Sequence, residues 1–158
     1  MIFVTLGTQA YPFDRLLRGL EAIDDEELVV QAGVSTFHPA GAVWFDYLEY
    51  PELREHVRRA RVVVSHAGVG SVMTTVAEGK RPVVVPRLHR YGEAVDDHQV
   101  PFARRLAETG LLTLVEDPAD LAAALAGPVP PLERTPGGES LLAADLRAYL
   151  EELVGYST

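Results

Sequence analysis

The sequence predicts an α/β domain: a Rossmann-like, doubly wound and mostly parallel sheet, followed by a C-terminal amphipathic helix. Short apolar runs alternate with amphipathic segments along most of the chain, which favours strands separated by helices. Several of these runs are wholly apolar, as expected for strands that helices cover on both faces. The chain has 158 residues, 47% of them hydrophobic, which suits one domain with an ordinary core and a terminal extension.

The predicted elements alternate in order along the chain. The predicted strands cover residues 2–7, 27–33, 42–48, 61–65, 81–86 and 111–116. The predicted helices cover residues 12–23, 51–60, 70–79, part of 96–110 and 118–127.

In the first half, each predicted element has a local reason. Residues 2–7 are short, apolar and end in glycine, which is typical of a buried strand. The helix at 12–23 places four apolar side chains on one face, those of Leu16, Leu17, Leu20 and Ile23. Residues 27–33 and 42–48 are the next apolar runs, and Pro51 suits the first turn of the following helix.

In the second half, glycine and proline mark where elements end. The β-branched runs at 61–65 and 81–86 predict two strands, and the short helix between them ends at Gly79. Gly110 stops the next helix, and Pro101 must lie near its start or kink it.

The composition divides the chain into three parts. The Rossmann-like domain is predicted over residues 1–126, and a linker rich in proline and glycine over 127–138. Residues 139–154 predict one amphipathic helix, with apolar side chains at 141, 142, 146, 149, 150 and 153. Two roles stay open for this helix: docking on a partner, or packing on its own sheet.

Charge and composition exclude several classes of function. A net charge of −9 repels nucleic acid and acidic membranes, so neither is expected as a direct partner. The absence of cysteine excludes disulfides and thiolate chemistry and fits a cytoplasmic protein. We expect no membrane insertion, because no apolar run approaches the roughly 18 residues of a membrane span. The histidines lack metal-ligand spacing, so we expect no protein-held metal.

A glycine turn, SHAGVGS at 65–71, is the first candidate site. It lies where a strand ends and a helix begins, which is where open parallel sheets bind ligands. Gly68 and Gly70 would let backbone N–H groups face an anion, and the helix N-terminus and the Ser71 hydroxyl would add to its binding. From these residues alone, a diphosphate cradle and an ordinary tight turn remain equally open.

Two further loops open onto the same edge of the predicted sheet. Gly7 and Thr8 follow the first strand and could complete a phosphate cradle or form only a βα turn. The loop at 87–99 is long for a βα connection, and long loops in compact domains are often functional. His98 and Gln99 would hydrogen-bond a sugar or a phosphate there.

Four stretches together resemble the C-terminal, nucleotide-sugar-binding domain of GT-B glycosyltransferases of family 28. They are VTLGT at 4–8, RVVVSHAGVGSVMTTV at 61–76, GKRPVVVP at 79–86 and DDHQ at 96–99. The likeness covers roughly residues 1–125 in the right order. Within the family, the chain is most similar to the small soluble subunits of two-chain UDP-GlcNAc transferases and to bacterial exopolysaccharide counterparts.

The resemblance implies half of a GT-B fold that holds a UDP-sugar, while a partner chain, often membrane-associated, holds a lipid-linked acceptor. The implied donor-binding residues are Gly7, Thr8, His66, Gly68, Val69, Gly70, Ser71, Thr74, His98 and Gln99, with Arg87 and Arg90 as candidate phosphate contacts. The implied chemistry is glycosyl transfer with inversion, without a metal or other cofactor and with a general base from the partner. The chain would be cytoplasmic and recruited to the membrane by that partner.

One position departs from the family pattern. The family places a ribose-binding glutamate in the helix after the glycine turn, where this chain has Thr74, and Glu78 lies one turn later. A threonine hydroxyl is shorter and uncharged, which leaves open that the chain is a non-catalytic regulatory or assembly module. A self-sufficient homodimeric glycosyltransferase is a further alternative.

Overall fold

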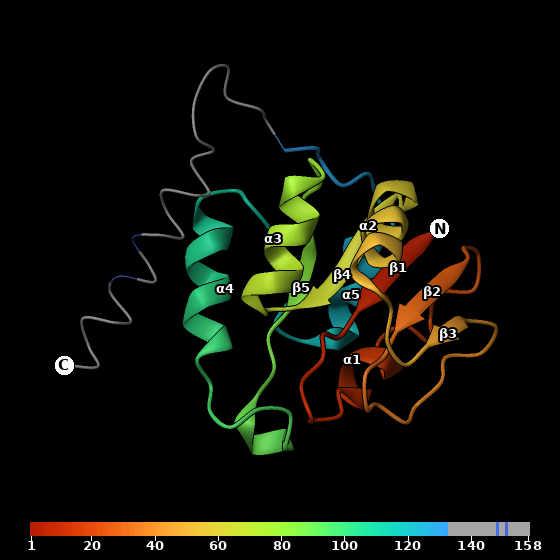
Figure 1. Ribbon diagram of the computed structural model, residues 1–158, viewed down its shortest axis with the longest axis horizontal. Helices are drawn as coiled ribbons and strands as arrows, with labels where there is room; N and C mark the ends of the chain where they lie inside the picture. The colour runs from red at the N-terminus through yellow and green to blue at the C-terminus, as the bar shows by residue number, and fades with distance from the viewer. Residues whose placement is uncertain (133–147, 149–150, 152–158) are drawn as a thin grey trace.

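The computed structural model describes residues 1–132, 148 and 151, and these form a parallel sheet covered by helices on both faces (Figure 1). The six strands are β1 (Ile2–Thr5), β2 (Leu28–Gln31), β3 (Val43–Phe45), β4 (Val62–His66), β5 (Val83–Val85) and β6 (Thr113–Leu114). The predicted linker and helix at 127–154 lie mostly outside the described residues. The predicted α/β fold is confirmed.

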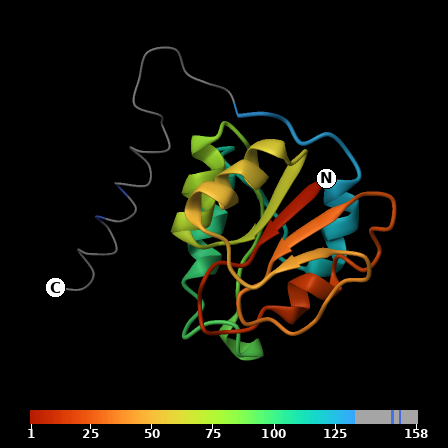
Figure 2. The ribbon, with the colours of Figure 1, turned by 45° about the vertical axis from the view of Figure 1, so that its right-hand side comes forward.

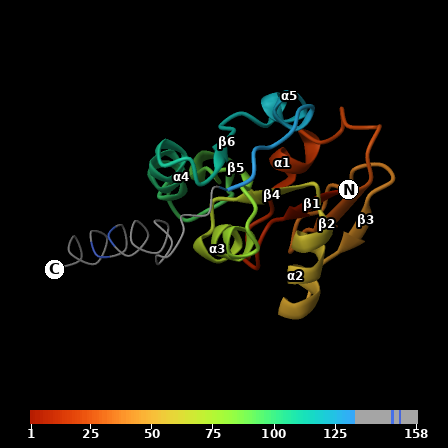
Figure 3. The same ribbon diagram turned by 90° about the horizontal axis from the view of Figure 1, so that it is seen from above.

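Helices and short 3-10 turns connect the strands. They are α1 (Asp14–Arg18), α2 (Tyr50–Arg59), α3 (Val69–Ala77), η1 (His89–Tyr91), α4 (Gln99–Glu108), η2 (Pro118–Asp120) and α5 (Leu121–Leu125). Figure 3 shows α1 and α5 on one side of the sheet and α2 and α3 on the other.

The alternation of side chains within each strand explains why both faces are buried. In β1, Ile2 and Val4 join the core under α1 and α5, while Phe3 points to the core under α2. In β5, Val84 packs in a third cluster with Phe102 and other side chains of α3 and α4. Wholly apolar strands of this kind are stable only between two layers of helices.

The strand order places a crevice at a defined point of the sheet. All five strand pairs are parallel, and the order is β3-β2-β1-β4-β5-β6. The chain therefore places β2 and β3 on one side of β1. It then returns to place β4 on the other side of β1 and adds β5 and β6 outward from β4. In such folds the ligand crevice lies beyond the carboxyl ends of the two strands where the direction reverses, here β1 and β4.

The two ends of the sheet differ in what covers them. Residues 126–132 leave α5 and run along the end where the strands begin (Figure 2), where Arg61 donates to the carbonyl oxygens of Leu125 and Gly127. The loop that carries η1 extends from the opposite end (Figure 1). The end with the crevice is therefore the end where the loops after β1, β4 and β5 gather.

Several predicted boundaries were wrong. The helix predicted at 12–23 is only α1, because the chain turns at Gly19, which lies against η2. The strand predicted at 111–116 contains only β6 at the sheet edge, and the helix predicted at 118–127 is split into η2 and α5. The fourth strand is shifted by one residue from the predicted 61–65 and ends at His66, which brings that side chain into the sheet.

The close approach of α1 to η2 gives a test of the fold. A Cβ on Gly19 would lie 2.5 Å from the backbone oxygen of Pro118, so Gly19→Ala forces the backbone apart. We expect it to lower the free energy of unfolding by about 1–3 kcal/mol, despite the better helix propensity of alanine. Gly127→Ala is the matched control, since nothing lies within 4 Å of its new methyl group. Urea unfolding would measure the stability of both variants. Equal stability of the two would contradict the close packing of α1 against η2.

Candidate functional site

His66 lies where the strand order reverses, at the carboxyl end of β4 and beside the end of β1. It is the last residue of β4 and is buried. A Cβ on Gly7 would lie 2.4 Å from its Nε2, and a Cβ on Gly68 would lie 2.2 Å from its Cε1. Gly7 and Gly68 are therefore needed to make room for an imidazole, not only for a ligand. Gly70 differs, because nothing lies within 4 Å of a Cβ placed there.

Gln99 and Ser71 hold the two ring nitrogens of His66. Gln99 Nε2 lies 3.4 Å from His66 Nδ1, and Ser71 Oγ lies 3.2 Å from His66 Nε2. Gln99 Oε1 in turn accepts hydrogen bonds from the backbone nitrogens of Ala67 and Arg87, at 3.2 and 3.1 Å. One buried amide thus connects the ends of β4 and β5 with the imidazole.

His66 is neutral in the folded protein. Burial lowers the pKa of its imidazole to about 3, and the positive charge of Arg87 acts in the same direction. At physiological pH it therefore offers one N–H donor and one acceptor and carries no charge.

Arg87 is a buried cation behind this imidazole. The residue is 1% exposed, and its guanidinium donates to the backbone oxygens of Leu6 at 2.7 Å, Tyr11 at 2.8 Å and Glu93 at 3.1 Å. Burial lowers its pKa to about 10, against the effect of Glu93, so it stays charged at neutral pH. Its hydrogen bonds join the end of β1 to the loop after β5. Loop arginines are usually exposed, whereas Arg87 is buried.

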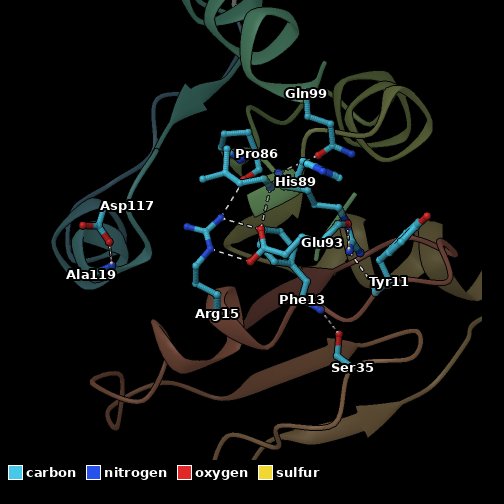
Figure 4. A network of polar contacts seen from close by, with 12 residues as sticks. Tyr11, Phe13, Arg15, Ser35, Pro86, His89, Glu93, Gln99, Asp117 and Ala119 are labelled. Carbon is cyan, nitrogen blue, oxygen red and sulfur yellow. Dashed lines mark hydrogen bonds and ion pairs between the residues drawn. The ribbon is translucent and has the colours of Figure 1, made fainter. Parts of the chain in front are cut away.

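The loop after β5 is attached to α1 by an ion pair. Figure 4 shows Arg15 and Glu93 facing each other, with Arg15 Nε 2.7 Å from a carboxylate oxygen of Glu93. The same carboxylate accepts from the backbone nitrogen of Leu88 at 2.9 Å. The single negative charge of Glu93 therefore acts on both Arg15 and Arg87, so this group of three side chains carries one excess positive charge.

The N-terminus of α3 opens beside His66. Its first intrahelical hydrogen bond runs from Val72 N to Gly68 O, so the N–H groups of Val69, Gly70 and Ser71 have no helical acceptor. No side chain caps the helix, and its first turn has no acidic residue. The helix dipole adds a partial positive charge at this point. This end of α3 can therefore accept an anion.

The remaining predicted residues lie around this centre in different ways. Thr8 is exposed next to Gly7, and His98 is exposed at the start of α4, with its ring paired to Asp96. Arg90 lies over the ring of Tyr91 and is exposed. Thr74 lies one turn into α3, and its hydroxyl donates to Gly70 O at 2.9 Å.

Glu78 lies at the other end of α3 and belongs to a separate contact. Arg54 and Arg58 of α2 donate to its carboxylate at 2.6 and 2.8 Å. Glu78 therefore connects α3 to α2 and does not replace the missing glutamate at Thr74.

Sequence reasoning missed Gln31, which shapes the turn after β1. Its Oε1 accepts from Thr5 Oγ1 at 2.7 Å, and its Nε2 donates to the backbone oxygens of Gly7 at 3.0 Å and Asp46 at 3.1 Å. The available signal was a single amide at the end of an otherwise apolar strand. Its burial fixes the carbonyl of Gly7 below the crevice.

Two features are absent from the described part of the chain. Within residues 1–132, no group of three or more histidine, aspartate or glutamate side chains could hold a metal ion. None of the helices in the described part of the chain is long and apolar enough to cross a membrane.

Comparisons with known proteins agree with the geometry. The family model of the glycosyltransferase family 28 C-terminal domain matches residues 1–134. The chain is 31% identical over 125 residues to the human UDP-N-acetylglucosamine transferase subunit ALG13, and this match covers 70% of the chain and 10% of the human protein. The subunit of the same name from Yarrowia lipolytica is 37% identical over 70 residues, covering 44% of the chain and 34% of that protein. The chain thus spans about a tenth of the human relative.

A solved structure supports the fold. The crystal structure of the glycotransferase of kitacinnamycin superposes with a TM-score of 0.55 at 18% identity, over 80% of this chain and 34% of that one. At this identity the likeness concerns the fold alone.

The burial of His66 predicts how it responds to pH. Its imidazole should show no NMR titration between pH 8 and pH 5, because the folded pKa is about 3. The unfolded chain takes up this proton near pH 6.5 and the folded chain does not. The unfolded state therefore binds more protons between these values, and this residue's contribution to stability falls as pH falls through that window. A titration midpoint near pH 6.5 in the folded chain would contradict the buried, neutral imidazole.

Proposed function

The chain belongs to glycosyltransferase family 28, and we propose that it is the UDP-sugar-binding subunit of a two-chain inverting glycosyltransferase that transfers a hexosyl or N-acetylhexosaminyl group. The observation that carries this proposal is the uncapped N-terminus of α3 beside the neutral His66, at the point where the strand order reverses. That combination provides donors for an anion and no opposing negative charge.

The diphosphate would bind at the N-terminus of α3. The N–H groups of Val69, Gly70 and Ser71 and the Ser71 hydroxyl would donate to its oxygens, as helix N-termini commonly do for phosphates. Gly7 and Thr8 would line the opposite side, after β1. Arg87 would act through its charge from behind the site, because its own bonds go to backbone oxygens.

The nucleoside and the sugar would extend from the diphosphate in opposite directions. Thr74 would contact the ribose, once its hydroxyl leaves Gly70 O, and a neutral hydroxyl would bind it less tightly than a carboxylate. His98, exposed at the start of α4, would contact the sugar or a phosphate, with Arg90 nearby on the loop.

In the proposed reaction, the acceptor hydroxyl oxygen attacks the anomeric carbon from the face opposite UDP. The bond between that carbon and the phosphate oxygen breaks, and its electron pair goes to UDP. The donors at α3 would stabilise the charge that develops on this leaving group, with no cofactor or metal required. A general base on the partner chain would take the proton from the acceptor.

A partner chain would cover the crevice and hold the acceptor. Large apolar side chains are exposed near this end of the sheet, among them Tyr11 and Val95 on loops, Tyr91 in η1 and Val69 at the start of α3. The relatives named above are described as subunits, which also supports a second chain. We propose that this partner is membrane-associated, binds a lipid-linked acceptor and recruits a cytoplasmic chain to the membrane.

Nucleotide binding is the first test. We expect UDP and UDP-GlcNAc to raise the melting temperature of the isolated chain in a panel that includes GDP- and dTDP-sugars. Absence of a shift with every nucleotide at millimolar concentration would contradict the proposal.

Two glycine variants locate the binding. Gly70→Ala has no steric conflict in the free protein, so it should leave the melting temperature within a few degrees and still weaken UDP binding by about tenfold or more, because the methyl group occupies the anion's approach. Gly68→Ala should lower both stability and binding, because its methyl group displaces His66. Equal UDP affinity of Gly70→Ala and the native chain would place the ligand elsewhere.

Thr74 motivates one alternative, a regulatory or assembly module that retains the fold. In that case the native chain would not bind UDP, and Thr74→Glu would create binding. Under the leading proposal, Thr74→Glu strengthens binding that already exists, and transfer activity appears only when the partner is added. Transfer by the purified chain to a simple acceptor would instead indicate the self-sufficient homodimer.

A further inference from the structure

We infer that Gln99 is a positioning residue: its amide holds His66 as the Nε2–H tautomer, so that the Ser71 hydroxyl hydrogen is directed to the ligand. The part of this inference that concerns the ligand rests on the proposed function, while the part that concerns the tautomer does not. The family resemblance implies a contact of Gln99 with the sugar or a phosphate, but in this chain the residue is only 1% exposed.

The orientation of the Gln99 amide follows from its backbone partners. Ala67 N and Arg87 N both donate to one atom of the amide, at 3.2 and 3.1 Å. Only the oxygen of an amide accepts hydrogen bonds, so this atom is Oε1. The amide nitrogen must then be the atom that faces His66 Nδ1.

The orientation of the amide sets the tautomer of His66. An amide nitrogen only donates, so His66 Nδ1 must accept and carries no hydrogen. The imidazole is neutral, since burial keeps its pKa far below physiological pH. Its single hydrogen therefore lies on Nε2, which donates to Ser71 Oγ at 3.2 Å.

The tautomer in turn frees the hydrogen of Ser71. The Ser71 oxygen accepts from His66, so its own hydrogen is available for another acceptor. Thr74 and Thr75 of the same helix donate back to the carbonyls of Gly70 and Ser71, both at 2.9 Å. Within residues 1–132, the Ser71 hydroxyl makes no such bond, and its contact is His66. With the opposite tautomer, Ser71 would donate to His66 and could only accept from a ligand, which is the wrong polarity for a phosphate oxygen.

The substitution Gln99→Glu tests this chain of hydrogen bonds. The introduced carboxylate can still accept from Ala67 N and Arg87 N, but it cannot donate, so His66 Nδ1 must carry a hydrogen. We expect the long-range 1H–15N spectrum of the native full chain to show a bare Nδ1 and a protonated Nε2. In Gln99→Glu, Nδ1 should be protonated. Where Nε2 is then bare, UDP affinity should fall by about tenfold or more, as for loss of a hydrogen bond to a charged group. Where the new carboxylate instead keeps both ring nitrogens protonated, Ser71 still accepts from Nε2 and UDP affinity should show no such fall.

A double-mutant cycle separates this mechanism from simple repulsion by the added charge. If Gln99 acts through the Ser71 hydroxyl, Gln99→Glu should have little further effect on UDP affinity in a Ser71→Ala background. A direct repulsion between the new carboxylate and the phosphates would persist undiminished in that background, and this result would overturn the inference.

The remaining outcomes each decide one part of the inference. A native spectrum with hydrogen on His66 Nδ1 overturns the tautomer, and it does so even if Gln99→Glu fails to fold. Unchanged UDP affinity in a variant whose Nδ1 is protonated and whose Nε2 is bare overturns the role of Ser71. If the native chain shows the expected tautomer and binds no UDP, the proposed function fails together with the ligand part, and the control of His66 by Gln99 stands.

Discussion

The crevice depends on one steric constraint: a buried imidazole must fit between two backbone segments at the ends of β1 and β4. His66 fills the space that a side chain on Gly7 or Gly68 would need, at 2.4 and 2.2 Å. Because neither glycine has a side chain, the turn after β1 and the start of α3 can approach each other closely, with the imidazole between them. The same approach brings the open N-terminus of α3 to the edge of the sheet, where parallel folds bind their ligands.

Electrostatics at this site differ from those of the chain as a whole. The net charge is −9, yet the charge that acts on His66 is the positive charge of Arg87, and the carboxylate of Glu93 interacts with both Arg87 and Arg15. Burying Arg87 is costly, and three backbone oxygens offset this cost in part. A charge held in this way cannot move away from an anion, and solvent screens it less than an exposed side chain.

The sequence predicted most of the fold because its strands are wholly apolar and its turns carry glycine. The alternation of strands and helices and the position of the glycine turn needed no knowledge of tertiary contacts. The errors lie where tertiary contacts determine where an element ends or whether a side chain is buried. Gly19 ends α1 because the chain packs on Pro118, about 100 positions away, and no local pattern reveals that contact. Arg87 and Gln99 resemble exposed loop residues in the sequence, and only the structure shows them buried and bonded to backbone. A polar side chain can position other groups once strands that are distant in the sequence surround it. The composition does not show which polar residues are surrounded in this way.

The magnitudes of these effects explain why the proposed site would need a second chain. A helix N-terminus that is exposed to water stabilises an anion by only about 0.3–1 kcal/mol, and solvent weakens each hydrogen bond to a similar net value. The same donors act more strongly when water is excluded, because the local dielectric constant falls. In this chain the first turn of α3 is open and Val69 is exposed beside it, so the donors are arranged but not covered. Under the proposed function, the isolated chain therefore binds the nucleotide through the water-exposed donors of α3 alone. The departing UDP is stabilised enough only when the partner chain that holds the acceptor covers the exposed apolar side chains around the site and excludes water.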